Sequence, residues 1–305
     1  MNTAKTTHIS PVGPQERRKA IVIGECFLDI KFDDSQPSAA TAGGDLLRAA
    51  CLTAHRGLST TMVGEICRDR AGSLVLDRLQ ADGVDTRSVD VYTEGSSATH
   101  LVFDEQRQTI AYGTYPQESL SVVWPRIDAD DVVVYGGTYV LEPRVRQHVA
   151  DILRYARDRR AMVVYVPAYS PWLAHRITRH MPAVLENLES ADLTVALPSD
   201  LSLLFGCDNA AWAFDERVRF HADRMLAIGG PVLELFGLQG LYASAHVGNA
   251  PVPEVLAALI EMLAETAINH ETIAMADNEA FSSFVGEVAS RIRACLKINV
   301  ADRSA

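Results

Sequence analysis

The chain has 305 residues, of which 48% are hydrophobic and 22% are charged, and its formal net charge is −11. This is an ordinary globular composition with enough apolar material for a large core. The acidic charge balance disfavours a broad nucleic-acid-binding surface and adhesion to an anionic membrane surface. No stretch approaches the run of about 18 apolar residues that a membrane-spanning helix requires.

The first 19 residues are polar and include Pro11, Gly13 and Pro14. They lack the apolar stretch of a signal peptide, so we expect a disordered leader over 1–19. The five cysteines are an odd number and form no C-x-x-C pair, which favours reduced thiols and a cytoplasmic location. The remaining residues, 20–300, are expected to form one α/β domain.

Short apolar strands alternate with amphipathic helices along most of the chain. In order, the patterns predict strand 20–24, helix 45–55, strand 60–63, helix 71–80, strand 131–135, helix 143–157, strand 161–166, strand 193–196, helix 199–205, helix 211–227 and strand 232–235. Two long helices are predicted over 253–268 and 278–298. This alternation predicts a doubly wound, Rossmann-like, mainly parallel sheet flanked by helices.

The segment 97–115 departs from that alternation. Apolar residues alternate with polar ones around a turn at Glu105–Gln106, namely Leu101, Phe103, Ile110 and Tyr112. This pattern is typical of an antiparallel hairpin outside the main sheet. Its apolar face is large for a two-stranded ribbon exposed to water, so we expect a homodimer that buries this face.

Three glycine-containing motifs occur with regular spacing in the first third of the chain. They are Ile23-Gly24-Glu25-Cys26-Phe27-Leu28-Asp29, the helix start Ala42-Gly43-Gly44-Asp45, and the stretch from Val63-Gly64-Glu65 to Gly83-Val84-Asp85-Thr86. Together they resemble the PfkB/ribokinase family of carbohydrate kinases, which act on sugars and nucleosides. The resemblance implies a ribokinase-like fold with a small β lid over the sugar, formed by strands at about 30–40 and 95–116.

The first two motifs contain candidate ligand-binding residues. Asp29 follows a strand's carboxyl end, in the crevice where open α/β sheets bind ligands, and its carboxylate suits vicinal hydroxyls. Gly43 and Gly44 let the backbone approach a ligand at a helix start. Asp45 stands where the family usually has Asn, so an acceptor-only carboxylate replaces an amide. The resemblance implies that these four residues bind substrate; the alternative is that Asp29 caps a turn that the glycines permit.

The family's catalytic signature is a Gly-Ala-Gly-Asp turn at a helix N-terminus, and it is not retained in that form. Its best match, 276–281, lacks both glycines and has Glu279 where the catalytic Asp would stand. Glu279 is therefore the candidate base, with Asp277 beside it; the alternative is that Asp277 and Asn278 cap the last helix. The family's nucleotide loop is matched at 235–240, which keeps Gly237 and Gly240 as candidate nucleotide-binding residues.

Two main functions remain open, beside an unrelated α/β enzyme that only mimics the motifs. In the first, a catalytically silent or repurposed homologue binds a sugar- or nucleoside-like small molecule. Altered family motifs at 166–170 and 197–200 favour this hypothesis. In the alternative, the chain is a divergent ATP-dependent sugar or nucleoside kinase that uses Glu279 as base and Mg·ATP as cofactor. The histidines show no zinc-site spacing, so no metal site is expected.

Overall fold

A computed structural model of the protein describes residues 18–33, 36–103, 108–116, 123–266 and 268–302. The expected leader lies outside the described residues apart from Arg18 and Lys19, and so does the expected turn at Glu105–Gln106. In the described part of the chain, no helix combines the length and the apolar character that crossing a membrane requires.

The larger of two sheets in the described residues has nine strands in the order β13-β12-β11-β10-β9-β8-β1-β4-β5. Their bounds are β1 (Ala20–Ile23), β4 (Thr60–Cys67), β5 (Val89–Tyr92), β8 (Val132–Gly136), β9 (Met162–Val166), β10 (Leu193–Ala196), β11 (Arg224–Gly229), β12 (Val232–Gly237) and β13 (Gly240–His246). The strands from β5 to β11 pair in parallel, and β12 and β13 add an antiparallel edge. The predicted doubly wound, mainly parallel sheet is confirmed.

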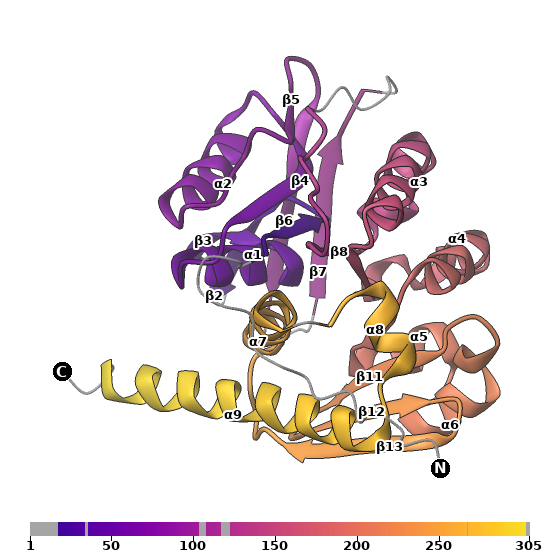
Figure 1. Cartoon of the computed structure of the whole chain (residues 1–305). Coiled ribbons are helices and arrows are strands. Elements are labelled where there is room, and N and C mark those ends of the chain that lie inside the picture. Colours follow the sequence, from indigo (N-terminus) through magenta and orange to yellow (C-terminus); the bar gives the residue numbers. More distant parts are fainter. Residues whose placement is uncertain (1–17, 34–35, 104–107, 117–122, 267, 303–305) are drawn as a thin grey trace, which may run out of the picture.

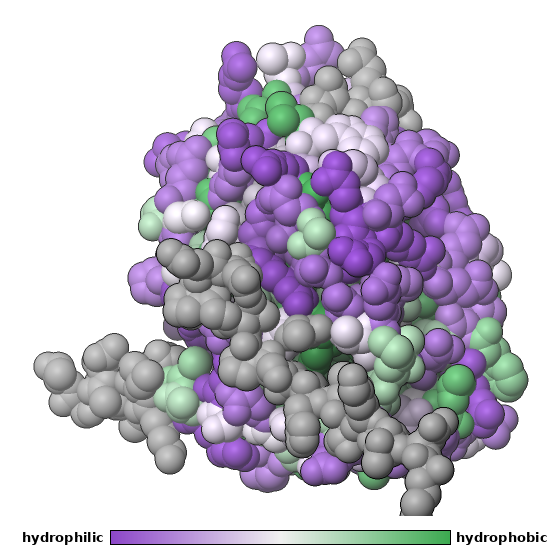
Figure 2. Space-filling view, viewed as in Figure 1, coloured by the Kyte–Doolittle hydropathy of each residue, from purple (hydrophilic) through white to green (hydrophobic). Residues whose placement is uncertain are grey.

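Helices cover both faces of this sheet (Figure 1). In β1, Ala20 and Val22 belong to one apolar cluster and Ile21 and Ile23 to the other, because successive strand residues point to opposite faces. The first cluster includes α1 (Asp45–His55), α2 (Arg70–Ala81), α7 (Val252–Glu265), α8 (His270–Met275) and α9 (Asn278–Asp302). The second includes α3 (Pro143–Asp158), α4 (Ile177–Ser190), α5 (Pro198–Phe205) and α6 (Ala210–Glu216). The face of the molecule in Figure 2 is correspondingly mostly hydrophilic.

The expected lid is a second, four-stranded sheet in the order β3-β2-β6-β7. It consists of β2 (Phe27–Asp33), β3 (Gln36–Gly43), β6 (Ser96–Phe103) and β7 (Gln108–Thr114). Strands β6 and β7 pair in antiparallel fashion, as the alternation over 97–115 predicted, and β2 pairs with β6 in parallel. Because β2 follows β1 after three residues, the lid sits at the carboxyl end of the central strand.

One predicted helix, 211–227, is wrong. Helix α6 ends at Glu216, a 3₁₀ turn covers Val218–Phe220, and strand β11 occupies Arg224–Gly229. The residues Met225–Ile228 are a short, fully buried apolar run between two strands, and periodicity alone does not distinguish such a run from a buried helix. The two long C-terminal helices are confirmed as α7 and α9, with the short α8 between them.

Candidate functional site

A cleft opens at the carboxyl edge of the large sheet, beneath the lid. A cavity of about 230 Å³ is lined by residues that follow three parallel strands and by the start of α1. These lining residues are Glu25, Phe27, Asp29, Gly44, Asp45, Leu46, Arg48, Gly137, Ala168 and Ser170. Open α/β sheets bind ligands at this position, outside the carboxyl ends of their strands.

Three of the four predicted substrate-binding residues, Asp29, Gly44 and Asp45, line this cavity. Gly44 is the N-cap of α1 and has a φ of 102°, which side-chain-bearing residues rarely adopt. The fourth predicted residue, Gly43, does not line the cavity, and close packing requires it to be glycine. A Cβ atom there would lie 2.1 Å from the Phe27 ring and 2.8 Å from Oδ2 of Asp29. The absence of a side chain at Gly43 therefore lets Phe27 and Asp29 pack against the chain.

Arg48 is a site residue that the sequence motifs did not reveal. Its Nη2 atom lies 2.5 Å from Oδ2 of Asp29, and its Nε donates to the carbonyl of Ala42 at 3.2 Å. On the other side of the carboxylate, Nδ1 of His100 lies 3.7 Å from Oδ1 of Asp29. The available signal was helical spacing, because Arg48 lies three residues after Asp45 and so on the same side of α1.

Burial changes the proton affinity of two groups around Asp29. It raises the pKa of Asp45, and the positive charge of Arg48 opposes that shift. It lowers the pKa of the His100 imidazole, and the Asp29 carboxylate opposes that shift. Burial thus favours the neutral form of both groups.

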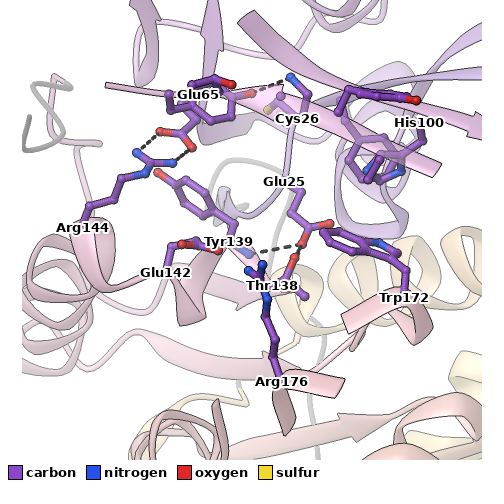
Figure 3. Close-up of a pocket in the computed structure, with 17 residues that line it drawn as sticks. Glu25, Cys26, Glu65, His100, Thr138, Tyr139, Glu142, Arg144, Trp172 and Arg176 are labelled. Atoms are coloured by element: carbon purple, nitrogen blue, oxygen red, sulfur yellow. Dashed lines mark hydrogen bonds and ion pairs between the residues drawn. The ribbon is translucent and has the colours of Figure 1, made fainter. Parts of the chain in front are cut away.

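A second cavity of about 450 Å³ adjoins the first, between the lid and the core (Figure 3). Both cavities are lined by Glu25 and Phe27. The lid contributes His100 and Tyr112, and the core contributes Tyr139 and Trp172. The 3₁₀ turn Pro171–Arg176 carries Trp172, whose ring makes an edge contact with His100 at a centroid distance of 6.2 Å. The cleft thus has a smaller polar part and a larger part that combines aromatic and charged side chains.

Glu25 lies where the two cavities meet. Its Oε1 accepts hydrogen bonds from the Thr138 amide at 2.5 Å, from the Thr138 hydroxyl and from the Tyr139 amide at 3.2 Å. Burial raises the pKa of this carboxyl, and the three hydrogen bonds oppose the rise. The interactions tie the segment after β8 to the segment after β1.

An ion pair forms the far wall of the larger cavity. Arg144 donates from both terminal nitrogens to the Glu65 carboxylate, with Nη1 at 2.6 Å from Oε2, and its guanidinium lies over the Tyr115 ring at 5.1 Å from the centroid. Only 5% of the Glu65 side chain is exposed. This pair connects β4, α3 and the end of the lid hairpin.

The structure does not bring Glu279, Gly237 or Gly240 to this cleft. Gly237 pairs with Arg224, the first residue of β11, so the β12–β13 turn lies at the amino edge of the sheet. Phe281, two residues after Glu279, lies beneath the Arg224 guanidinium at 5.9 Å. The start of α9 and this turn are therefore at the edge opposite Asp29.

Asp277 has a structural role at that edge. Its Oδ1 accepts from the Ala280 amide at 2.8 Å, which is the hydrogen bond of a helix cap at the start of α9. Asp277 therefore caps the last helix, as the alternative interpretation of this segment predicted.

A different helix begins at the ligand-binding edge. His246, the last residue of β13, pairs with Val232 at the carboxyl edge, and α7 starts six residues later at Val252. Topology therefore places the stretch 247–251 and the β11–β12 turn on the same edge as Asp29. The segments that the sequence predicts for the catalytic turn and the nucleotide loop lie at the opposite edge.

Asp200 is fully buried below the cleft. Its Oδ1 accepts from the Tyr169 amide at 2.7 Å, and its Oδ2 accepts from the amides of Ala168 at 3.2 Å and Leu197 at 3.0 Å. Burial raises the pKa of Asp200 to about 7 against the effect of these bonds. Both oxygens are engaged with the backbone. Among the described residues, no group of three or more His, Cys, Asp or Glu side chains is arranged to hold a metal ion.

A family match identifies the class of protein to which the chain belongs. Residues 18–222 match the family described as pfkB family carbohydrate kinase, which covers more than half of the chain. The chain belongs to the PfkB family, so the resemblance in its motifs is confirmed. A ribokinase from Bacillus subtilis (strain 168) is 21% identical over 188 residues, which are 58% of this chain and 64% of the relative. The match thus spans less than two thirds of that protein.

Solved structures of sugar and riboside kinases share the fold. A Vibrio cholerae O395 fructokinase double mutant with fructose, ADP and potassium bound has a TM-score of 0.73 and 12% identity, covering 92% of this chain and 91% of its own. A Salmonella enterica aminoimidazole riboside kinase, complexed with aminoimidazole riboside and an ATP analogue, has a TM-score of 0.68 and 16% identity, covering 91% of each chain. A Xylella fastidiosa fructokinase with bound ATP has a TM-score of 0.69 and 16% identity, covering 94% and 100%.

Proposed function

We propose that this chain binds a sugar- or nucleoside-like small molecule in the cleft between lid and core. The observation that carries the proposal is the meeting of Asp29, Gly44 and Asp45 in one cavity at the carboxyl edge of the sheet. Ionised carboxylates accept hydrogen bonds from hydroxyl groups, and such charge-assisted bonds are stronger than neutral ones. Arg48 adds a donor beside them.

The comparisons favour ATP-dependent phosphorylation of that ligand over silent binding. The family match and the structures of kinases that hold ADP, ATP or an ATP analogue support this candidate. Because Glu279 lies at the opposite edge of the sheet, a kinase reaction in this cleft has to use another base. Asp45 and Glu25 are carboxylates that line the cleft and have raised pKa values, a common property of general bases.

Other residues at the carboxyl edge favour slow or absent phosphoryl transfer. The stretch before α7 reads Gly248-Asn249-Ala250-Pro251, which starts like the family's Gly-Ala-Gly-Asp but has Pro251 in place of the aspartate. The first carboxylate of α7, Glu254, is paired with Arg56. Asp200, the acidic residue of the altered motif at 197–200, has both oxygens engaged by backbone amides. None of these three positions therefore offers the free carboxylate that the family's motifs would provide for phosphoryl transfer from Mg·ATP.

Calorimetry with D-ribose, D-fructose and adenosine, each with and without Mg·ATP, tests ligand binding, and an assay for ADP release tests phosphoryl transfer. Saturable binding of at least one of these ligands is expected. Coupled assays for ADP release are expected to show turnover below about 0.1 per second, under the usual kinase range of about 1–100 per second. Faster turnover would establish an ordinary kinase, and absence of all binding would contradict the proposed function.

The lid also supports the homodimer expected from the sequence. Tyr112 on β7 is 59% exposed, and Phe32 and Phe103 stack on neighbouring lid strands at a centroid distance of 4.7 Å. A second copy that covers this sheet would bury aromatic surface. Separately, all five cysteines are free thiols, which agrees with the cytoplasmic location expected from the sequence. Light scattering at high micromolar concentration tests the dimer, and a monomeric mass would contradict it.

A further inference from the structure

The two adjoining cavities differ in chemistry. The smaller cavity contains the carboxylates of Asp29 and Asp45 and the guanidinium of Arg48. The larger one is about twice its volume and is lined by several aromatic side chains, with the charged residues Glu65, Glu142, Arg144 and Arg176 on its core side. A polyol that satisfies the carboxylates would occupy the smaller cavity and leave the aromatic surface exposed to water. The cleft as a whole is therefore suited to a ligand with two parts.

The aromatic wall offers both ring faces and ring edges. The Phe27 and His100 rings lie 3.9 Å apart between centroids, and Trp172 approaches His100 by an edge at 6.2 Å. Trp172 remains 39% exposed although it lines the cavity, so part of the indole surface has no cover from the chain. Planar heterocycles stack on such surfaces, and alanine substitution of one stacked aromatic typically weakens base binding by about 1–3 kcal/mol.

Glu25 has an acceptor directed at the same space. Its Oε1 is fully used by Thr138 and Tyr139. Each of the three hydrogen bonds recorded for this carboxylate among the described residues ends on Oε1 and none on Oε2. Figure 3 shows Glu25 beside Trp172. Glu25 lines both cavities. A partly buried carboxylate oxygen without a partner accepts an N–H or O–H donor from a ligand.

We propose that the natural ligand is a nucleoside-class molecule, with its polyol part beside Asp29 and Asp45 and a planar, N–H-bearing ring against Trp172 and Glu25. The inference rests on the proposed function and narrows it from sugars and nucleosides to nucleosides. Phe27 and Glu25, which line both cavities, contact the ligand where its two parts join.

Fluorescence and calorimetry on the full chain test this assignment. The probes are adenosine, guanosine, cytidine and uridine, compared with D-ribose and D-fructose. At least one nucleoside is expected to bind ten times more tightly than either sugar and to change the tryptophan emission. Trp172→Phe should abolish the emission change, whereas Trp212→Phe should keep it, because Trp212 is on α6 and contacts Arg217 instead.

Two further variants test whether Trp172 and Glu25 contact the nucleoside, and thermal melting separates a lost contact from a loss of folding. Trp172→Leu is expected to weaken nucleoside binding about tenfold or more, the scale of one lost stacking contact. Glu25→Gln keeps an Oε1 acceptor for Thr138 and Tyr139 but directs an amide donor into the cavity, so nucleoside affinity should fall about tenfold and by more than ribose affinity does. Thermal melting confirms that each variant is folded.

The outcomes distinguish this inference from the proposed function. If D-ribose or D-fructose binds as tightly as every nucleoside, or if the Trp172 and Glu25 variants leave nucleoside affinity unchanged, the nucleoside assignment is wrong and the proposed function stands. If no sugar and no nucleoside binds, both are wrong.

Discussion

The Nη2 atom of Arg48 lies 2.5 Å from Oδ2 of Asp29, so the carboxylate expected to bind the ligand is already paired with a cation. The pair is partly open to the cleft, since 39% of the Arg48 side chain and 12% of the Asp29 side chain are exposed. A ligand hydroxyl can therefore accept from Arg48 and donate to Asp29 at the same time. The pair also keeps Asp29 in place before a ligand arrives, which lowers the entropic cost of binding.

Replacing Asp29 by alanine should weaken ligand binding at least tenfold. Hydrogen bonds to a charged group contribute about 1.5–3 kcal/mol each, and about 1.4 kcal/mol corresponds to a factor of ten. Calorimetry with whichever of D-ribose, D-fructose and the four nucleosides binds the unmodified chain most tightly measures the change. Asp33→Ala, at the exposed end of the same strand, is the matched control and should bind like the unmodified chain. Equal affinity in both variants would place the ligand elsewhere.

Glu279→Gln should change neither ligand binding nor any phosphoryl transfer. The residue begins α9 at the edge of the sheet opposite the cleft, where Phe281 contacts Arg224. Steady-state ADP release and calorimetry measure the two properties. Asp45→Ala, which removes a carboxylate that lines the cleft, is the comparison that should reduce binding. A loss of turnover in Glu279→Gln alone would restore Glu279 as the base.

The fold could be predicted because its signals are local. Buried apolar runs, helical periodicity and glycine turns determined most elements, and the alternation over 97–115 identified the lid hairpin. The run at Met225–Ile228 was misassigned because full burial removes the polar face that separates a strand from a helix. The pairing of β11, β12 and β13 determines at which edge of the sheet the residues from 237 to 281 lie. Strand pairing is not a local property, so the sequence pattern did not reveal that edge.

The site was predictable only in part. Asp29, Gly44 and Asp45 follow a strand or open a helix, so their place at the carboxyl edge could be inferred. The spacing of Arg48 from Asp45 places it on the same side of α1, but its contact with Asp29, nineteen positions earlier in the chain, is visible only in the structure. Trp172 reaches the cleft from a turn after β9 and meets the lid residue His100, a contact between distant segments. Such pairs depend on tertiary packing.

The Glu65–Arg144 pair should contribute strongly to stability when one partner is removed. The side chains are 5% and 13% exposed, so Glu65→Gln or Arg144→Met leaves a mostly buried charge without its partner, which costs about 3–5 kcal/mol. Urea unfolding measures the loss. The double variant should lose less than the sum of the two single losses.

An exposed pair provides the control for that experiment. Arg154 and Asp151 lie on α3 with 67% and 31% of their side chains exposed, and Arg154→Met should cost at most about 1 kcal/mol. If Arg144→Met costs no more than Arg154→Met, the buried pair does not stabilise the junction between lid and core.

His100 should make the protein less stable as the pH falls from 7.5 to 5. Burial lowers the pKa of His100 in the folded chain, whereas an unfolded histidine has a pKa near about 6.5. Below that value the unfolded state binds more protons than the folded state, so the free energy of unfolding falls with falling pH. His100→Gln removes this contribution, and its stability should decline less over the same range. Urea midpoints at several pH values measure both slopes, with His246→Gln, an exposed substitution on β13, expected to follow the unmodified chain. Parallel slopes for the His100 variant and the unmodified chain would show that His100 accepts a proton equally well in both states.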